Sequence, residues 1–313
     1  MTVRSQQSPN SFPETCLITG AGGFIGNALC SELRRRGATT HGCGRTAPAG
    51  ASIDVSHQCD VSALSEVRQI IDEVRPAVVF HCASKVTGAR ELEAVMPTFY
   101  DNLVGAVNIL QAATETGDIR VVQLGSLQEP DEPTSQGIAP SPYAASKLAA
   151  SAYTRMFAEL YALPASVARV FMVYGPGQLD FAKLIPYVLK SLLNGQTARM
   201  SSGRQEFDWV YVDDVVDALI AIAAHDGLRG RTVDVGSGTL TSVRDIAMGL
   251  GQRLDLEGLL DFDAIPDRRL EPTRKADIEA TAALLGWRSR VSLEEGLDRT
   301  VAWYQRHLGR LTS

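Results

Sequence analysis

The sequence predicts an α/β fold in which a doubly wound parallel sheet is followed by a smaller α/β region. From residue 15 to about residue 170, short β-branched runs alternate with longer amphipathic stretches, which is typical of βαβ units. A glycine-rich turn joins the first such run to the first amphipathic stretch. After the turn "YGPGQ" at 174–178 the pattern becomes less regular, which indicates a second region. We therefore divide the chain into a disordered tail (1–14), a sheet domain (15–175) and a second region (176–313) that returns some strands to the main sheet.

Each element follows from its period. The predicted strands are apolar or β-branched runs bounded by turn residues, and they cover 15–20, 38–43, 77–83, 119–126 and 165–175, with a further short strand before Asp60. The predicted helices carry apolar residues three and four apart, and they cover 24–37, 64–75, 98–117 and 142–162. The second region is expected to hold helices at 184–195, 213–225, 277–287 and 292–308, and strands at 208–212 and 231–238.

The composition indicates a soluble globular protein. Of 313 residues, 45% are apolar, and the formal net charge of -6 is spread along the chain with no basic run beyond Arg34-Arg35-Arg36. An extended nucleic-acid surface is therefore not expected. The first dozen residues lack the apolar core of a signal peptide, and no apolar run reaches the roughly 18 residues of a membrane span. We expect a cytoplasmic protein with no nucleic-acid or membrane partner.

The residues that commonly bind metals form no ligand pattern. The five cysteines are an odd number and contain no C-x-x-C pair, which argues against a disulfide framework and a zinc site and fits a reducing compartment. The five histidines are dispersed. Asp213 and Asp214 precede an apolar helical pattern, where carboxylates favour the helix dipole. No metal site is expected.

The glycine-rich turn has the spacing G-x-x-G-x-x-G, from Gly20 to Gly26. Glycine permits a tight turn and a close approach of the backbone to a pyrophosphate, and the following helix offers free N–H groups to the anion. A glycine triplet alone is weak evidence, but its place between a strand and a helix at the start of a βαβ series predicts dinucleotide binding. The residues expected to hold the cofactor in this turn are Gly20, Gly23, Phe24, Ile25 and Gly26.

The end of the second strand indicates which dinucleotide binds. An acidic residue there accepts hydrogen bonds from the ribose 2′-hydroxyl of NAD, whereas an arginine suits the 2′-phosphate of NADP. The segment "GCGRT" at 42–46 contains Arg45 and no acid. We therefore predict that NADP(H) is preferred and that NAD(H) is possible. Asp60 and Val61, after the third strand, are expected near the adenine.

Six short segments follow one another in a specific order: "GAGGFIG" at 20–26, "HCAS" at 81–84, "NLVG" at 102–105, "GS" at 125–126, "YAASK" at 143–147 and "RVFMVYGPGQ" at 169–178. Together they resemble the extended short-chain dehydrogenase/reductase family, in its branch that acts on nucleotide-activated sugars. The resemblance extends from about residue 15 to residue 308. It implies a Rossmann-type fold, with Ala83 at the cofactor and with Ser84 and Val86 at the substrate.

The resemblance assigns the chemistry to Ser126, Tyr143 and Lys147. Moving a proton on or off a sugar oxygen during hydride transfer needs an acid/base whose pKa is near neutrality. A phenol with its ordinary pKa of ~10 is too weak a base, and a lysine one helical turn away can lower that pKa by its positive charge. Tyr143 would be the acid/base, Lys147 would also hold the nicotinamide ribose, and Ser126 would hydrogen-bond the reacting oxygen. Without the glycine-rich turn, Tyr143 and Lys147 would read as two ordinary residues of an amphipathic helix.

Departures from the family pattern reduce the number of reaction classes that fit the sequence. In the 4,6-dehydratases of the family an Asp-Glu pair follows the residue that matches Ser126, whereas Leu127-Gln128 stands here, with Glu129 one step further. A dehydratase is therefore not expected. The two open classes are a ketoreductase, which the NADP-like Arg45 favours, and an epimerase that retains NAD. A non-catalytic dinucleotide-sensing protein would usually lack the tyrosine or the lysine. We predict the reduction of a keto-deoxysugar nucleotide, with an epimerase as the alternative.

Two residues that the family uses for the substrate diphosphate are replaced. Met172 stands where the family has an asparagine, and Phe207 stands where it commonly has an arginine. Arg204 and Arg268 are cations that can compensate through fork-like contacts. We predict that Met172, Arg204 and Arg268 contact the substrate.

The helices at 98–117 and 142–161 carry apolar residues on more than one face. Members of the family commonly dimerise through these two helices, so the resemblance implies a homodimer. The apolar residues concerned are Val104, Ile109, Leu110, Leu148, Tyr153, Met156 and Phe157.

Overall fold

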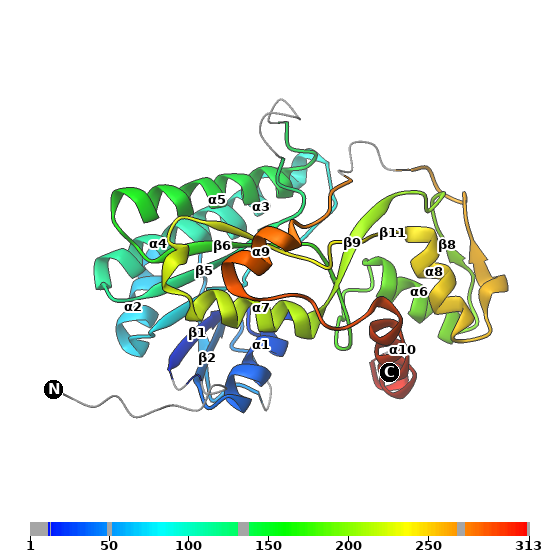
Figure 1. The fold of residues 1–313 in the computed structure, drawn as a ribbon, viewed down its shortest axis with the longest axis horizontal. Coiled ribbons are helices and arrows are strands. Elements are labelled where there is room, and N and C mark those ends of the chain that lie inside the picture. Colours follow the sequence, from blue (N-terminus) through cyan, green and yellow to red (C-terminus); the bar gives the residue numbers. More distant parts are fainter. Residues whose placement is uncertain (1–11, 13, 49–51, 131–137, 268–272, 312–313) are drawn as a thin grey trace. The chain divides into compact units, whose positions relative to one another are not determined.

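The structure is a computed structural model, and it describes residues 12, 14–48, 52–130, 138–267 and 273–311 (Figure 1). The tail expected at 1–14 lies outside these residues except for Phe12 and Glu14. The chain forms two compact units. The first contains the residues up to 125 together with 141–168 and 219–232, and the second contains 126–140, 169–218 and the residues from 233 onward.

A seven-stranded sheet confirms the predicted α/β class. Its strand order is β10-β6-β5-β4-β1-β2-β3, and β1 pairs in parallel with both β2 and β4. The sheet is thus wound outward from β1 in both directions, and such a sheet binds ligands at the carboxyl ends of the strands at this switch point. The strands are β1 Thr15–Thr19, β2 Thr39–Gly44, β3 Val55–Gln58, β4 Val78–His81, β5 Arg120–Ser126, β6 Ala165–Val170 and β10 Thr232–Val235.

Helices cover both faces of this sheet. Figure 1 shows α2, α4 and α5 side by side on one face and α1 on the other. The helix predicted at 98–117 is present but interrupted, because a π-helical segment, Phe99–Val104, joins α3 to α4. The helices are α1 Phe24–Arg35, α2 Leu64–Val74, α3 Val95–Thr98, α4 Gly105–Thr116, α5 Pro142–Leu160 and α7 Val212–Ala224.

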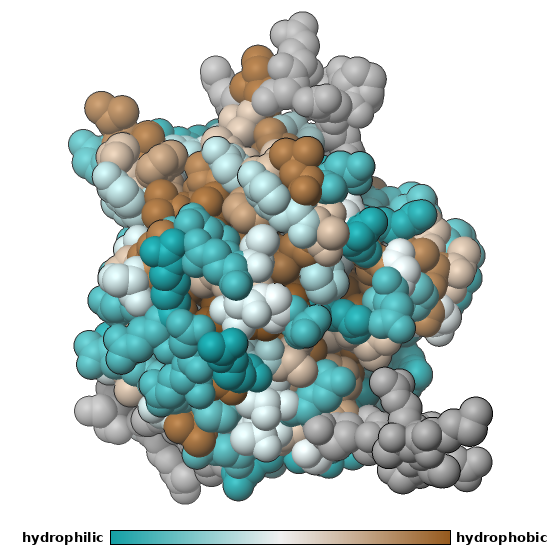
Figure 2. Space-filling view, turned by 90° about the vertical axis from the view of Figure 1, so that its left-hand side faces the viewer, coloured by the Kyte–Doolittle hydropathy of each residue, from teal (hydrophilic) through white to brown (hydrophobic). Residues whose placement is uncertain are grey.

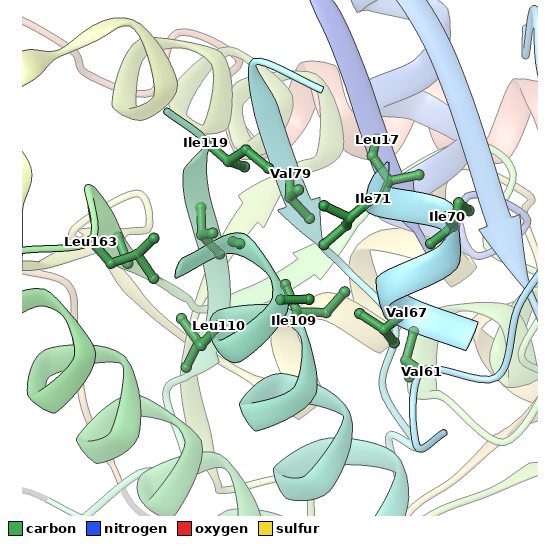
Figure 3. Packing of buried hydrophobic residues seen from close by; sticks show 14 of the residues in the cluster. Leu17, Val61, Val67, Ile70, Ile71, Val79, Ile109, Leu110, Ile119 and Leu163 are labelled. Atoms are coloured by element: carbon green, nitrogen blue, oxygen red, sulfur yellow. The ribbon is translucent and has the colours of Figure 1, made fainter. Parts of the chain in front are cut away.

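The core beneath α2 and α4 is apolar. Leu17 of β1 and Val79 of β4 belong to one buried cluster with Ile71 of α2 and with Ile109 and Leu110 of α4 (Figure 3). Full burial of an aliphatic side chain stabilises the fold by about 1.5–3 kcal/mol. Ile109 and Leu110, expected at a dimer face, therefore belong to the core, and so does the similarly expected phenylalanine of α5, Phe157.

The second unit contains smaller sheets. One has the order β11-β9-β7, and β12 pairs with β8 in another. The strand predicted at 165–175 is in fact two strands in different sheets, β6 and β7, which part at Phe171, whose N–H donates to the carbonyl of Val235 (3.0 Å). The strands are β7 Met172–Tyr174, β8 Ala198–Arg199, β9 Glu206–Tyr211, β11 Leu240–Ser242 and β12 Leu260–Asp261. The helices are α6 Leu184–Leu193, α8 Val243–Gln252, α9 Ile278–Leu285 and α10 Leu293–Leu311.

The acidic pair at the start of α7 has a structural role. Asp213 and Asp214 lie in its first turn. Asp214 is buried and accepts the N–H groups of Arg290 and Val291, each at 3.0 Å. Burial raises the pKa of this carboxyl above its usual value, and the two donors compensate part of the cost of burial. The carboxylate of Asp214 therefore ties α7 to the chain that precedes α10.

Several further properties concern the described ranges as a whole. No helix among them is long and apolar enough to cross a membrane, and no three histidine, cysteine or acidic side chains there gather to hold a metal ion. All five thiols are free. Figure 2 shows the face seen from the left of Figure 1, where apolar and polar residues are interspersed.

Gly26 packs against the turn that precedes its own helix. A methyl group at this position would overlap the carbonyl oxygen of Gly20 and lie 2.9 Å from Cα of Ala21. Because both neighbours are backbone atoms, we predict that Gly26→Ala lowers the free energy of unfolding, measured by urea denaturation, by about 2 kcal/mol or more. The control is Gly258→Ala, whose added methyl has nothing within 4 Å and should change that free energy by less than about 0.5 kcal/mol. Equal effects of the two substitutions would contradict the steric explanation.

Candidate active site

The glycine-rich turn lies at the carboxyl end of β1. The N–H of Gly20 donates to the carbonyl of Cys43 on β2, and the N–H of Gly23 donates to the carbonyl of Gly20, each at 2.9 Å. Gly20 has a φ of 66°, which favours glycine, and a methyl group there would lie 2.8 Å from the backbone of Ala83. α1 then begins at Phe24 with no side chain capping its first turn. Its first N–H groups are therefore left for a ligand or solvent.

A buried hydrogen-bond chain joins the ends of β1 and β4. Thr19 and His81 are paired in register, and Thr19 Oγ1 lies 2.7 Å from His81 Nδ1. The same hydroxyl accepts the N–H of Ala83 (3.1 Å), so one oxygen contacts both the imidazole and the backbone after β4. His81 therefore holds the residue before the glycine-rich turn against the strand end that carries Ala83.

His81 is fully buried and uncharged near neutral pH. Burial, and after it the positive charge of Lys147, lower the pKa of the imidazole to about 3. In the part of the chain that the structure describes, Nε2 of this ring has no hydrogen-bond partner, so the charged ring, which carries a hydrogen on both nitrogens, would have one N–H without an acceptor. Lys147 consequently has a neutral neighbour instead of a second cation.

α5 presents Tyr143 and Lys147 on its buried side. The helix begins cleanly because Ser141 Oγ accepts the N–H of Ala144 (3.1 Å) and Pro142 occupies the first turn. Tyr143 is 8% exposed and Lys147, one turn later, is 3% exposed. Lys147 Nζ donates to the carbonyl of Leu124 on β5 (2.9 Å). The ammonium group is thus directed at the sheet, which is rare for a lysine.

Asn102 links α5 to the loop after β4, although the sequence gives this residue no role. Its Oδ1 accepts the N–H of Lys85 (2.7 Å) and the hydroxyl of Ser84 (3.0 Å). Its Nδ2 donates to Ser146 Oγ (2.9 Å), and that hydroxyl donates to the carbonyl of Tyr143 (2.8 Å). Ser84, predicted at the substrate, and the helix turn of Tyr143 are therefore held by one buried amide. In the sequence, Asn102 stands out only as the first residue of the segment "NLVG", one of the six segments that carry the family resemblance.

Ser126 ends β5 and is supported by a buried carboxylate. Its N–H donates to Oε1 of Glu129 (2.7 Å), and its Oγ accepts the N–H of Gln128 (3.2 Å). The main-chain carbonyl of Glu129 accepts a hydrogen bond from Arg274 Nη1 (3.2 Å). Glu129 thus stabilises the turn that follows β5. The sequence shows only that Glu129 lies three residues after Ser126. It does not show that the carboxylate of Glu129 accepts the N–H of Ser126.

The residues predicted at the adenosine end lie after β2 and β3. Asp60 Oδ1 accepts the N–H (2.9 Å) and the hydroxyl (2.8 Å) of Ser62. Val61 lies against α4, because a methyl group added to Gly105 would be 2.8 Å from its Cγ2. Arg45 has an ion pair that the sequence does not indicate, with its Nη1 3.3 Å from Oδ2 of Asp101.

The residues predicted to bind the substrate come from several elements. Val86 is 50% exposed, Met172 begins β7 and is partly buried, and the side chain of Arg204, just before β9, is exposed. Phe207, which replaces an expected arginine, is buried and packs edge to face with the next aromatic ring of β9. It is therefore a core residue of the second unit. Arg268 lies outside the described residues.

The turn and its surroundings fit a dinucleotide. Gly20 and Gly26 have no room for a side chain, so the turn packs closely on the backbone after β4 and on itself, and the uncapped start of α1 offers N–H donors to a pyrophosphate. The residues that the sequence predicts at the cofactor are Gly20, Gly23, Phe24, Ile25, Gly26, Arg45, Asp60, Val61, Ala83, Tyr143 and Lys147.

The doubly wound sheet, the glycine-rich turn and the Tyr143–Lys147 pair define an extended short-chain dehydrogenase/reductase. More closely, the chain belongs to the NAD dependent epimerase/dehydratase family, whose model matches residues 16–236.

Known proteins resemble the chain over nearly its whole length. The UDP-glucose 4-epimerase of Mycolicibacterium smegmatis is 31% identical, over 92% of this chain and 98% of that protein. The dTDP-glucose 4,6-dehydratase 1 of Escherichia coli is 26% identical, over 92% of each. The solved structure of the Thermus thermophilus UDP-glucose 4-epimerase, in complex with NAD, superposes with a TM-score of 0.81 at 25% identity and covers 93% of this chain and 99% of that one.

His81 makes the stability of the protein dependent on pH. The folded-state pKa of about 3 lies below the ordinary value of about 6.5, so the unfolded chain takes up a proton that the folded chain does not. The contribution of the neutral His81 ring to the free energy of unfolding is complete above about pH 6.5. It is lost as the pH falls toward 3, and the loss amounts to about 2 kcal/mol at pH 5. We predict that His81→Asn, whose amide can still hydrogen-bond to Thr19, flattens this loss in urea unfolding between pH 7 and pH 5. Equal pH dependence of the variant and the parent would contradict the assignment.

Proposed function

We propose that the protein catalyses hydride transfer at a hydroxyl-bearing carbon of a nucleotide-activated sugar, with Tyr143 as acid/base, and that it acts as an epimerase. The observation that carries the proposal is the buried pair on α5. Lys147, whose ammonium donates to the Leu124 carbonyl (2.9 Å), follows Tyr143 by one helical turn on α5, and both residues are nearly inaccessible. A cation fixed there favours the phenolate over the phenol.

The roles of the remaining residues follow from their places. When bound, the nicotinamide accepts or supplies the hydride. Tyr143 takes the proton from the sugar hydroxyl as the hydride leaves and returns it when the hydride comes back. Lys147 also holds the nicotinamide ribose, and Ser126 donates to the reacting oxygen. We assign dinucleotide binding to residues 15–175 and substrate binding mainly to 176–313. At the substrate, Arg204 and Arg268 come from the second region, and Ser84, Val86 and Met172 come from the first.

Two observations rank the reaction classes. The UDP-glucose 4-epimerase relative, at 31% identity over almost the full length, supports an epimerase that retains its cofactor. Arg45 after β2 supports the second candidate, an NADPH-dependent ketoreductase of a keto-deoxysugar nucleotide. A dehydratase is less well supported, because Leu127 is a buried apolar residue where those enzymes need a proton-transfer group.

The two candidates differ in cofactor stoichiometry. We predict that purified protein converts a UDP-hexose to its C4 epimer without net change in reduced nicotinamide, followed by absorbance and by chromatography of the sugar nucleotide. Consumption of one NADPH per keto-sugar nucleotide reduced, with no epimerisation, would establish the ketoreductase instead. No conversion of any nucleotide sugar with either cofactor would refute the proposed function.

Tyr143→Phe removes the acid/base but keeps the ring. We predict a fall in kcat of about 10²–10⁴-fold with an unchanged Kd for the cofactor, measured by steady-state kinetics and fluorescence titration. Tyr153→Phe is the matched control, because Tyr153 lies on the same helix and is 42% exposed; its kcat should equal that of the parent. An active Tyr143→Phe enzyme would exclude the assigned role.

We also propose that the protein is a homodimer. Three of the apolar residues that were expected at the dimer interface belong to the core instead. The apolar residues that could contact a second copy of the chain are therefore the exposed ones around α3 and α5. Leu92, Met96, Phe99 and Tyr100 are between 42% and 82% exposed, and single large apolar residues gathered on one segment favour association.

Met96 offers a test of this face. It is 51% exposed, and Leu179 in the second unit is 52% exposed. We predict that Met96→Glu gives a monomer in size-exclusion chromatography with light scattering, because a charge in an apolar interface is unpaired, while Leu179→Glu leaves the mass unchanged. A dimeric Met96→Glu protein would place the interface elsewhere.

A further inference from the structure

The position of Arg45 is fixed by the glycine-rich turn. The carbonyl of Cys43, two residues earlier, accepts the N–H of Gly20 (2.9 Å), and the carbonyl of Gly44 accepts the N–H of Cys59 (2.8 Å). Arg45 therefore leaves the sheet at the edge that carries the turn. In a doubly wound dinucleotide fold, the residue that meets the 2′ position of the adenosine ribose stands at this strand end.

Asp101 reaches the same edge from a different element. It belongs to the π-helical segment Phe99–Val104, which runs directly into α4. α4 is fixed against the predicted adenine loop, because Asn108 Nδ2 donates to the carbonyl of Val61 (2.9 Å) and Gly105 leaves no room for a methyl group beside Val61. The helix thereby holds Asp101 on the adenosine side of the site.

The two side chains meet at their charged ends. Arg45 Nη1 lies 3.3 Å from Oδ2 and 3.4 Å from Oδ1 of Asp101. The arginine side chain is 69% exposed and the aspartate 21% exposed. Exposed ion pairs of this kind add little to stability, so the consequence of the pair is to be sought in the charge that it presents to a ligand.

The net charge of the Arg45–Asp101 pair differs from the charge that Arg45 alone would present at the end of β2. Arg45 by itself would offer a cation to a 2′-phosphate, which carries a charge between about -1.5 and -2 at neutral pH. With Asp101 beside it the local charge is zero, and the phosphate must either displace the carboxylate or lie next to it. A 2′-hydroxyl is neutral and can donate to a carboxylate.

We propose that Asp101 sets the dinucleotide selectivity of this site and favours NAD(H) over NADP(H). Its carboxylate pairs with the guanidinium of Arg45, and it provides the acidic group that is missing from the end of β2. The inference rests on the proposed dinucleotide-dependent function of the same site. Asp101 acts on the 2′-phosphate through Arg45 and is in that respect a positioning residue, whereas Arg45 is the group that would meet the phosphate.

The test is the ratio of two dissociation constants. NADH and NADPH are titrated separately into the full-length protein at one fixed salt concentration, with nicotinamide fluorescence as the readout. Asp101→Asn keeps the size of the side chain and removes its charge. In this variant the Kd for NADPH should fall about tenfold, whereas the Kd for NADH should stay equal or rise. The selectivity between the two cofactors should therefore shift toward NADPH. Asp101→Glu keeps the carboxylate and should restore the selectivity of the parent.

Two further variants separate this effect from others. Arg45→Gln should weaken NADPH binding about tenfold with less effect on NADH. Asp72→Asn makes the same change of net charge at another exposed ion pair, 3.2 Å from Arg75 on α2, and should move neither constant.

The outcomes bear separately on the two proposals. An unchanged ratio in Asp101→Asn, or the same shift in Asp72→Asn, would overturn the role of Asp101 while both cofactors still bind. Failure of the parent protein to bind either cofactor would refute the dinucleotide function itself, and the selectivity inference with it.

Discussion

The close approach of the ends of β1 and β4 is the constraint on which the rest of the site depends. Gly20 lies so near the backbone of Ala83 that no side chain fits between them, and Thr19 and His81 hydrogen-bond across the same two strands. Sterics and a buried hydrogen bond therefore fix the same junction independently. The glycine-rich turn, the uncapped start of α1 and the loop that carries Ser84 all begin from this junction, so their relative positions follow from it.

The side chains that we propose to be catalytic are positioned by polar contacts in an otherwise apolar layer. Lys147 is anchored to β5 at Leu124, and Asn102 connects the loop after β4 to Ser146. Buried polar groups are stabilising only when each is satisfied, so these contacts fix the orientation of α5 more strictly than apolar packing alone would. The neutral state of His81 belongs to the same arrangement, since a charged ring would repel the nearby ammonium of Lys147.

Periodicity and turn chemistry predict the sheet domain well, because its strands and helices are long enough to show their periods. They do not predict the short strands β8, β11 and β12, because two or three residues show no period and because tertiary pairing decides them. The division of the predicted 165–175 strand at Phe171 has the same origin. α8 is also missing from the prediction, although it is ten residues long and its buried residues lie three and four apart. In the site, spacing along one helix reveals Tyr143 and Lys147. The contacts of Asn102, Glu129 and Asp101 join segments distant in sequence or depend on side-chain direction, and neither is visible in residue order.

The π-helical segment Phe99–Val104 has a consequence for how this chain tolerates change in length. A π turn contains about one residue more than an α turn, and each residue corresponds to about 100° of rotation. Deleting Leu103 or Val104 would convert the segment into an ordinary α-helix with the usual backbone hydrogen bonds. The residues before the deletion would nevertheless be turned away from the partners they now meet, Asn102 from Ser84 and Ser146, and Asp101 from Arg45. A one-residue gap at this place in a related sequence would therefore mark a protein with the same fold but without the contacts that Asn102 and Asp101 make here.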